Sequence, residues 1–275
     1  VLPQLAEGEP RADRVETGHD VDRRVGDQRP AVVVGVRRVG GDPLELREGA
    51  RARWADELSR VKVEAQPDVL TSFYTALYHT AMGPVVHSDV DGRYRGLDGN
   101  IHKAEGFTNY TIFSLWDTYR AQHPLLTILH PLRTVHMVQS MLAHQQQSVH
   151  GVLPVWSHHG NENWCMIGYH AVSAIADALV KGAPGVDPRR ALAACVATSR
   201  VPYFDGLGEY DTLGWVPDEA SGSSVSVTLE FAYDDWCIGQ LARLVGDRAL
   251  AERYEERSRA WRNVYDPQTG FMRPR

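Results

Sequence analysis

The amino-acid sequence predicts an all-α protein built from antiparallel helix pairs, the plan that helical toroids use. Two features of the sequence favour this class. From residue 68 onward, successive segments repeat apolar side chains at the spacing that is typical of helices with one buried face. No comparable series of segments alternates apolar and polar residues, so the sequence offers no set of strands for a sheet.

Composition bounds what the chain can do. Its 275 residues are 43% hydrophobic, which is enough to bury one sizeable core. A net charge of -6 leaves no basic face to neutralise phosphates, so no nucleic-acid partner is expected. No apolar run approaches the roughly 20 residues of a membrane-spanning helix, so no membrane span is expected. Cys165, Cys195 and Cys237 lack CxxC spacing and are expected to be buried thiols.

Three regions of the chain differ in composition and in the periodicity of their apolar residues. Residues 1–50 begin with a charged stretch that has neither helical nor strand periodicity, typical of poorly ordered chain, and then include an apolar segment at 31–39 that fits one strand. Residues 51–67 are expected to form a linker helix, within a helical pattern over 48–63 that places Trp54, Leu58 and Val61 on one side. Residues 68–275 are predicted to be the folded helical domain.

The helical domain is punctuated by recognisable caps. A first helix is expected from Asp68, a candidate N-cap. The segment 83–109, rich in Gly, Asp and His, is expected to be a shaped functional loop because it is long for a simple connection. Asp187 before Pro188 predicts a capped helix start, and Gly182 predicts a helix end. Further helices are predicted at 124–130, 131–147, 164–181, 187–199, 225–245 and 247–264.

A first candidate binding segment is FSLWDTYRAQHPL, which contains Trp116, Asp117, Tyr119 and Arg120. An indole stacks on the face of a sugar ring, while a carboxylate and a guanidinium hold its hydroxyls. The alternative is that Asp117 and Arg120 only cap a helix, because an acidic first turn is ordinary helix chemistry.

A second candidate segment, GVLPVWSHHGNENWCMIGYHAV, brings His158, His159, Glu162 and His170 together with two tryptophans. A zinc site is disfavoured, because HHxxE lacks the one-turn histidine spacing of HExxH. Polar contacts to a sugar fit these side chains better. For His170 the alternative is a hydrogen-bonded core histidine.

A third candidate segment is SVSVTLEFAYDDWCIGQLA, which places Glu230, Asp234 and Asp235 along an otherwise apolar helix. A buried carboxylate is stable only when it is paired or strongly hydrogen-bonded, so Glu230 or Asp234 is expected to face a cavity. The sequence contains no GxSxG, GxxxxGK[ST] or GxGxxG motif. Carboxylates with aromatic residues remain, and these are the groups that glycoside hydrolysis requires.

Beyond these single segments, the chain resembles glycoside hydrolase family 92, whose members are exo-acting α-mannosidases. The resemblance covers about two hundred residues, from Phe73 to Pro274, and is therefore far more specific than one motif. The segments that carry it follow the family's order: SFYTALYH, SDVDGRYRGLDGNIH, NYTIFSLWDTYRAQHPLLTILHP, MVQSML, GVLPVW, CMIGYHA and VTLEFAYDDWCI.

The resemblance implies a two-domain enzyme, with an N-terminal β-sandwich followed by an (α/α)6 barrel. Residues 1–50 would then hold a remnant of the sandwich, and residues 68–275 the N-terminal portion of the catalytic barrel. The implied reaction is inverting hydrolysis of terminal α-linked mannose from glycans, assisted by a calcium ion. A full-length protein of this kind is expected to be secreted or at the cell surface.

The resemblance also bears on individual residues. Trp116 and Asp117 match a family position that lines the mannose subsite, and Arg120, Glu162, His170 and Asp234 are assigned to substrate binding by their chemistry. No catalytic or metal-binding residue is assigned. The family's acid, in an EGN-type motif, its base, in a GNDD-type motif, and most calcium ligands are expected beyond Arg275, so the chain alone is expected to be inactive. Two alternatives stay open: a non-catalytic carbohydrate-binding helical module, and another (α/α)6 glycosidase.

Overall fold

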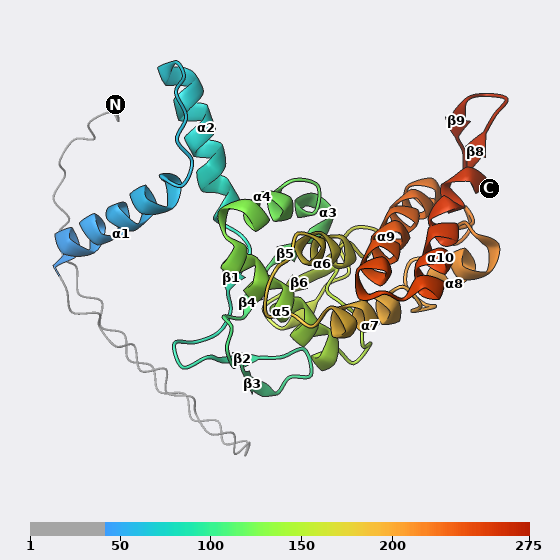
Figure 1. Ribbon diagram of the computed structural model, residues 1–275, viewed down its shortest axis with the longest axis horizontal. Coiled ribbons are helices and arrows are strands. Elements are labelled where there is room, and N and C mark those ends of the chain that lie inside the picture. Colours follow the sequence, from blue (N-terminus) through green and yellow to red (C-terminus); the bar gives the residue numbers. More distant parts are fainter. Residues whose placement is uncertain (1–41) are drawn as a thin grey trace, which may run out of the picture. The chain divides into compact units, whose positions relative to one another are not determined.

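The computed structural model describes residues 42–275 (Figure 1). The strand predicted at 31–39 and the poor order predicted for the first thirty residues therefore lie outside the described part. The chain divides between Ala50 and Arg51, and the core belongs to the second unit, Arg51–Arg275.

The described residues are predominantly helical, which confirms the predicted class at that level. The helices are α1 (Pro43–Leu58), α2 (Pro67–Thr80), α3 (Leu115–Thr118), α4 (Gln122–Leu129), α5 (Pro131–Gln147), α6 (Ala171–Val180), α7 (Pro188–Thr198), α8 (Leu207–Leu213), α9 (Ser224–Val245) and α10 (Arg248–Arg257), with a 3-10 helix, η1, at Ser258–Asn263.

Short strands interrupt the helices, and the sequence did not predict them. All pairs are antiparallel: β1 (Val85–Val86) with β4 (Tyr110–Thr111), β2 (Arg93–Arg95) with β3 (Ile101–Lys103), β6 (Trp156–His158) with both β5 (Phe113–Ser114) and β7 (Asn161–Glu162), and β8 (Tyr265–Asp266) with β9 (Phe271–Met272). The segment predicted as a loop at 83–109 thus contains a hairpin. Strands of two or three residues are too short to show a period of two, so no pattern could reveal them.

Several helix boundaries agree with the sequence. The structure confirms α5 at the predicted bounds, and the Asp187 side chain caps α7 by accepting the N–H of Arg189 at 2.9 Å. Gly182, at φ +84°, ends α6 as predicted. Two starts are shifted: α2 begins at Pro67, with Gln66 rather than Asp68 as its N-cap, and α1 begins at Pro43 instead of residue 48.

The start of α6 is the largest error. A helix was predicted from Trp164, but α6 begins at Ala171. Residues 164–170 form a loop in which Trp164, Met166 and Gly168 have φ values of +55°, +69° and +79°. The apolar spacing of this loop imitates a helix, yet positive φ values are incompatible with a right-handed helix.

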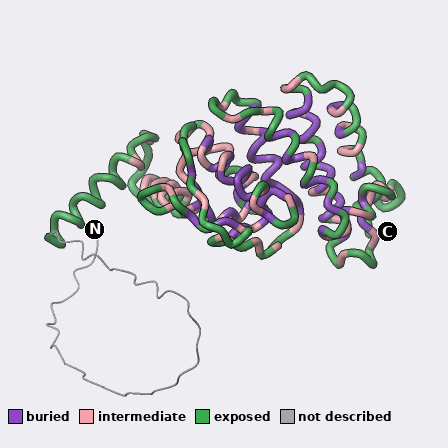
Figure 2. Tube along the Cα trace, turned by 90° about the horizontal axis from the view of Figure 1, so that it is seen from below, coloured by how far each residue is buried: buried purple, intermediate pink, exposed green. Residues whose placement is uncertain are grey.

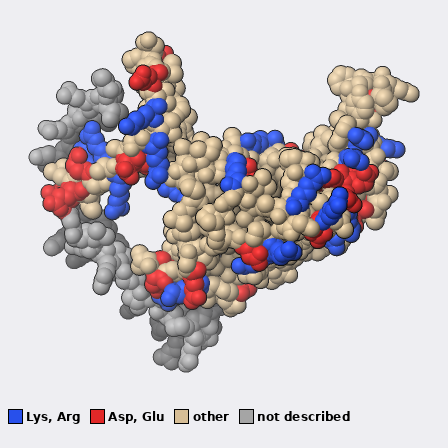
Figure 3. All heavy atoms as spheres, in the orientation of Figure 1, with Lys and Arg blue, Asp and Glu red and all other residues tan. Residues whose placement is uncertain are grey.

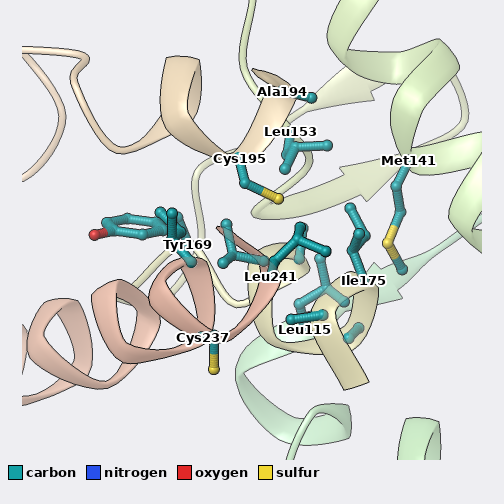
Figure 4. Packing of buried hydrophobic residues seen from close by; sticks show 14 of the residues in the cluster. Leu115, Met141, Leu153, Tyr169, Ile175, Ala194, Cys195, Cys237 and Leu241 are labelled. Carbon is teal, nitrogen blue, oxygen red and sulfur yellow. The ribbon is translucent and has the colours of Figure 1, made fainter. Parts of the chain in front are cut away.

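The core is centred on α9, which packs against α6, α7, α10 and η1. Figure 4 shows part of this cluster, in which Leu115, Leu153, Ile175 and Leu241 are each at most 1% exposed. Each such side chain contributes about 1.5–3 kcal/mol by leaving water. The helices around α9 have buried inner sides, whereas α1 is exposed along most of its length (Figure 2).

The cysteine prediction is correct for two of the three residues. Cys195 and Cys237 are buried in the core, whereas Cys165 is exposed because it lies in the loop before α6 rather than in a helix. No disulfide joins the cysteines of the described residues.

The surface carries mixed charge. On the face shown in Figure 3, acidic and basic side chains lie close together over α10 and η1, where Arg259 of η1 pairs with Glu256 of α10 at 2.7 Å. Within residues 42–275, none of the helices combines the length and the apolar character that crossing a membrane demands.

Candidate functional site

His170 is the centre of the candidate site. It is the N-cap residue of α6, and its ring lies between two carboxylates of α9. Nδ1 lies 2.9 Å from Asp234 Oδ1, and Nε2 lies 2.9 Å from Glu230 Oε2. The second oxygen of Asp234 accepts the N–H of Tyr169 at 2.8 Å. Asp234 and Glu230 are four residues apart, so one helix face presents both to the same ring.

The charges of this group support one another. Burial opposes protonation of His170, but the charge and hydrogen bond of Asp234, followed by the nearby carboxylate of Glu230, outweigh it and raise the pKa of the imidazole to about 9. Burial would raise the pKa of Glu230, but His170 and Arg120 lower it overall. At neutral pH the ring is therefore an imidazolium beside an ionised Glu230. Burial raises the pKa of Asp234.

The group extends to α3 through aromatic and cationic contacts. Tyr119 stacks on the His170 ring with centroids 4.1 Å apart and donates its hydroxyl to Glu230 at 3.2 Å. Arg120 pairs with Glu230 at 3.1 Å, and its guanidinium carbon lies 5.0 Å from the Trp116 ring centroid. Trp116, Arg120, Glu230, His170 and Asp234 thus form one continuous chain of contacts.

Trp116 and Asp117 both retain free hydrogen-bonding capacity. The indole N–H of Trp116 is buried and has no hydrogen-bond partner among residues 42–275. Asp117 is exposed in the first turn of α3. Buried polar groups without partners are rare in folded proteins and call for an explanation such as an absent ligand. An unpaired donor next to an exposed acceptor suits a ligand with hydroxyl groups.

Glu162 lies outside this chain of contacts. Its carboxylate accepts the backbone N–H groups of Trp156 at 2.8 Å and of Trp164 at 3.0 Å on Oε1, and that of Val155 at 3.0 Å on Oε2. His144 Nε2 lies 3.5 Å from the same side chain, and burial lowers the pKa of His144 to about 3, which keeps its ring neutral. Glu162 therefore holds the loop between β6 and α6 in shape.

The structure thus connects four of the six residues assigned from the sequence: Trp116, Arg120, His170 and Asp234. Asp117 is adjacent in α3, and Glu162 is separate. The sequence analysis expected either Glu230 or Asp234 to face a cavity. In the structure, Glu230 joins Arg120 to His170. Its one-turn spacing from Asp234 was the available signal, whereas its partner Arg120, in the turn after α3, is 110 residues away in the chain.

The chemistry of this group is that of polyol binding. It offers a guanidinium, an imidazolium, a carboxylate and an indole at one place, and these fix the hydroxyls and the face of a sugar ring. Among residues 42–275, no three His, Cys, Asp or Glu side chains are arranged to hold a metal ion. No calcium ligand is therefore assigned among the described residues.

Comparison with known proteins places this helical chain among the glycosidases. Residues 39–275 match the model of the glycosyl hydrolase family 92 catalytic domain, and the chain belongs to that family. The family suggested by the sequence is thereby confirmed.

Solved structures of family members are similar in fold and sequence. A family GH92 α-mannosidase from Bacteroides thetaiotaomicron is 46% identical, with a TM-score of 0.84 over 86% of this chain and 32% of that chain. The same enzyme has been solved in complex with mannoimidazole. A family GH92 inverting mannosidase from the same organism is 34% identical, with a TM-score of 0.79 over 86% of this chain and 33% of that one.

A curated relative is an uncharacterized secreted glycosidase of Arthroderma benhamiae. It is 30% identical over 122 residues, which cover 38% of this chain and 16% of the relative. The chain thus spans about a third of the length of the solved relatives and less of the curated one.

Proposed function

We propose that this chain forms the sugar-binding part of an exo-acting α-mannosidase that removes terminal α-linked mannose from glycans. The observation that carries the proposal is the chain of contacts from Trp116 through Arg120 and Glu230 to His170, in a family member whose relative binds mannoimidazole. The described residues include side chains that can bind a sugar, and the mannoimidazole complex of the relative supports mannose as that sugar.

Each residue of the site has a proposed role. Trp116 stacks on the mannose ring, and Asp117 and Arg120 bind its hydroxyls. Both ring nitrogens of His170 already lie beside carboxylates, and Nε2 could donate to a sugar hydroxyl only by giving up its contact with Glu230. We therefore assign His170 and Glu230 to a charged wall of the subsite. Asp234 has both oxygens occupied and is proposed to fix the position and charge of His170. Glu162 is proposed to shape the neighbouring loop.

The bond-breaking step is proposed to use groups outside this chain. An inverting hydrolase needs one carboxyl to protonate the leaving oxygen and another to activate water. The two motifs expected for these roles do not occur among these 275 residues. Calcium remains part of the proposal through the family resemblance.

The proposal extends to architecture and location. The helices of residues 68–275 would form the first part of an (α/α)6 barrel, preceded in the full protein by a β-sandwich domain. The full-length protein would be secreted or held at the cell surface, in line with the secreted relative of Arthroderma benhamiae.

The decisive experiment measures mannose released from α-linked mannobioses, with calcium and with a chelator. It compares this chain with a longer one that continues through the motifs named above. We expect activity only in the longer, calcium-loaded chain, and we expect an Asp117→Ala variant of it to lose most of that activity.

Other outcomes would contradict the proposal in distinct ways. Activity in the short chain would show that the catalytic carboxylates lie within residues 1–275. Mannose binding without hydrolysis in both chains would support a carbohydrate-binding module instead. Preference for glucosides would indicate another (α/α)6 glycosidase.

A further inference from the structure

A second group of aromatic and polar side chains lies around the first half of the loop that leads into α6. His150, Trp164, Tyr203, Phe204, Asp205 and Ser223 border a cavity of about 620 Å³. Small-molecule sites commonly enclose about 300–1,000 Å³, so the cavity is large enough for a sugar ring. None of the six residues assigned to the first site lines this cavity.

The cavity has an aromatic wall that is held in place. The His150 ring contacts the edge of Trp164 at 5.4 Å between centroids, and Trp164 packs on Phe204 at 5.3 Å. His150 Nδ1 lies 2.8 Å from the Tyr203 hydroxyl. Tyr203 is nevertheless 63% exposed, although an aromatic ring gains free energy when it is covered. An exposed ring that is fixed by a hydrogen bond is well prepared to stack on a ligand.

The backbone around the cavity is strained. Among residues 42–275, five non-glycine residues have positive φ values, and three of them line this cavity: Trp164 at +55°, Met166 at +69° and Asp205 at +41°. Such conformations persist only where surrounding contacts hold them, and they concentrate at binding sites. One of these contacts is the hydrogen bond from the Trp164 N–H to Glu162.

The remaining lining is polar. Asp205 is half-buried at the cavity, where burial raises the pKa of its carboxyl and the Ser221 side chain opposes that rise. Ser223 lies at the start of α9, so its neighbourhood includes the N–H groups of a helix end. A purely apolar ligand would leave the Asp205 carboxylate without a partner, which is costly. A ligand with both an apolar face and hydroxyl groups satisfies every part of the lining.

We propose that this cavity binds a second sugar ring of the same glycan whose terminal mannose occupies the Trp116–Asp117 site. One loop connects the two places, because Trp164 lines the cavity and His170, six residues on, is the centre of the first site. The proposal rests on the function proposed above for its first ring. The cavity would make the protein selective for oligosaccharides over single sugars.

The test is calorimetric titration of the extended chain, and of the 275-residue chain, with methyl α-mannopyranoside and with α-mannotriose. We expect Tyr203→Ala to weaken mannotriose binding about five- to tenfold, the effect of one lost aromatic stack. Methyl α-mannopyranoside should bind Tyr203→Ala as it binds the parent. Tyr265→Ala is the matched control, since Tyr265 is also an exposed tyrosine but lies in β8, away from the cavity.

A second, more conservative variant distinguishes a loss of binding from a loss of folding. Trp164→Phe keeps an aromatic ring in the wall and is expected to weaken mannotriose binding about threefold with an unchanged melting temperature. The extended chain is titrated with a chelator present, and the 275-residue chain is expected to be inactive, so both titrations measure binding without hydrolysis and the result stands even if the chain proves not to be a mannosidase. Mannotriose affinity that is unchanged in both variants would overturn the proposal. A loss of methyl α-mannopyranoside binding in Tyr203→Ala would also overturn it, since the cavity would then be the primary site.

Discussion

Asp234 and Asp235 are successive residues of α9 with completely buried side chains, yet they belong to two different groups of contacts. Asp235 accepts the hydroxyls of Tyr169 and Tyr210, both at 2.9 Å, and pairs with Arg257 at 3.0 Å. Asp234 pairs with His170, which contacts Glu230 and through it the exposed Arg120.

The difference lies in where each group of contacts ends. The Asp235 group joins α8, α9 and α10, and its charged atoms have partners within the protein: Arg257, which is 13% exposed, also pairs with the exposed Asp211 of α8. The Asp234 group ends on Arg120 and Trp116, and the Trp116 indole nitrogen has no hydrogen-bond partner among the described residues. Burial of a carboxylate therefore does not by itself distinguish a structural group from a binding group, whereas a buried polar atom without a partner, such as the Trp116 indole nitrogen, marks an end that can bind a ligand.

Breaking the internal group should have the largest effect. Asp235→Ala would remove the buried carboxylate that pairs with Arg257 and accepts two tyrosine hydroxyls, so we expect the free energy of unfolding to fall by about 3–5 kcal/mol. Urea unfolding followed by circular dichroism measures this loss. The surface variant Glu256→Ala, at a 75% exposed position, should stay within about 0.5 kcal/mol of the parent. Similar small losses for both would contradict the structural role of Asp235.

The Asp234 group should instead make the free energy of unfolding depend on pH. The pKa of His170 is raised to about 9, compared with an ordinary value of 6.5, so the folded state holds this proton more tightly than the unfolded state. The resulting stabilisation, on the order of 3 kcal/mol, is fully present below pH 6.5 and is lost as the pH rises through 9. Unfolding free energies from pH 6 to 9.5 should show this decline, and His170→Gln should remove most of it.

His123 provides an internal control for that measurement. Burial alone lowers the pKa of its imidazole to about 4. Histidine NMR at pH 7.5 should therefore find His170 protonated and His123 neutral. A neutral His170 at this pH would contradict the charged wall proposed for the sugar site.

The sequence could predict α5 and the cap of α7, because Pro131, Asp187 and Pro188 act locally. It could not predict the loop before α6, whose shape depends on a hydrogen bond from the Tyr169 N–H to Asp234, 65 residues away. The same limit applies to the site. Trp116, Arg120 and His170 were found by residue type, but their connection through Glu230 depends on tertiary packing.

The cavity beside Trp164 shows this limit most clearly. Tyr203 and Asp205 belong to no recognisable sequence motif. Asp205 reaches the cavity through a left-handed turn, with φ values of +41° at Asp205 and +76° at Gly206. Only the Asp-Gly pair gave a local signal for that turn. What the turn faces could be known only from the folded chain.

Removing the charge of Glu230 should sharpen the distinction between the two groups. Glu230→Gln keeps the shape of the side chain but weakens the contacts to His170 and Arg120, so we expect mannoside binding to fall about tenfold. Stability should change by less than about 1 kcal/mol, because Glu230 is partly solvated and the Asp234 contact remains. Titration calorimetry and urea unfolding of the same variant measure both quantities. A large loss of stability would place Glu230 with Asp235 among the structural carboxylates.

The smallest expected effect concerns the geometry of Arg120. Its guanidinium stacks on Trp116 and Tyr119 while it pairs with Glu230, and a lysine ammonium cannot reproduce this planar contact. Arg120→Lys should therefore weaken mannoside binding about threefold, whereas Arg120→Ala should weaken it further by removing the charge as well. Arg259→Lys, at an exposed position of η1, is the matched control and should bind like the parent. If Arg120→Lys also binds like the parent, only the charge at this position matters, and the stacked indole of Trp116 would have to orient the sugar without the guanidinium.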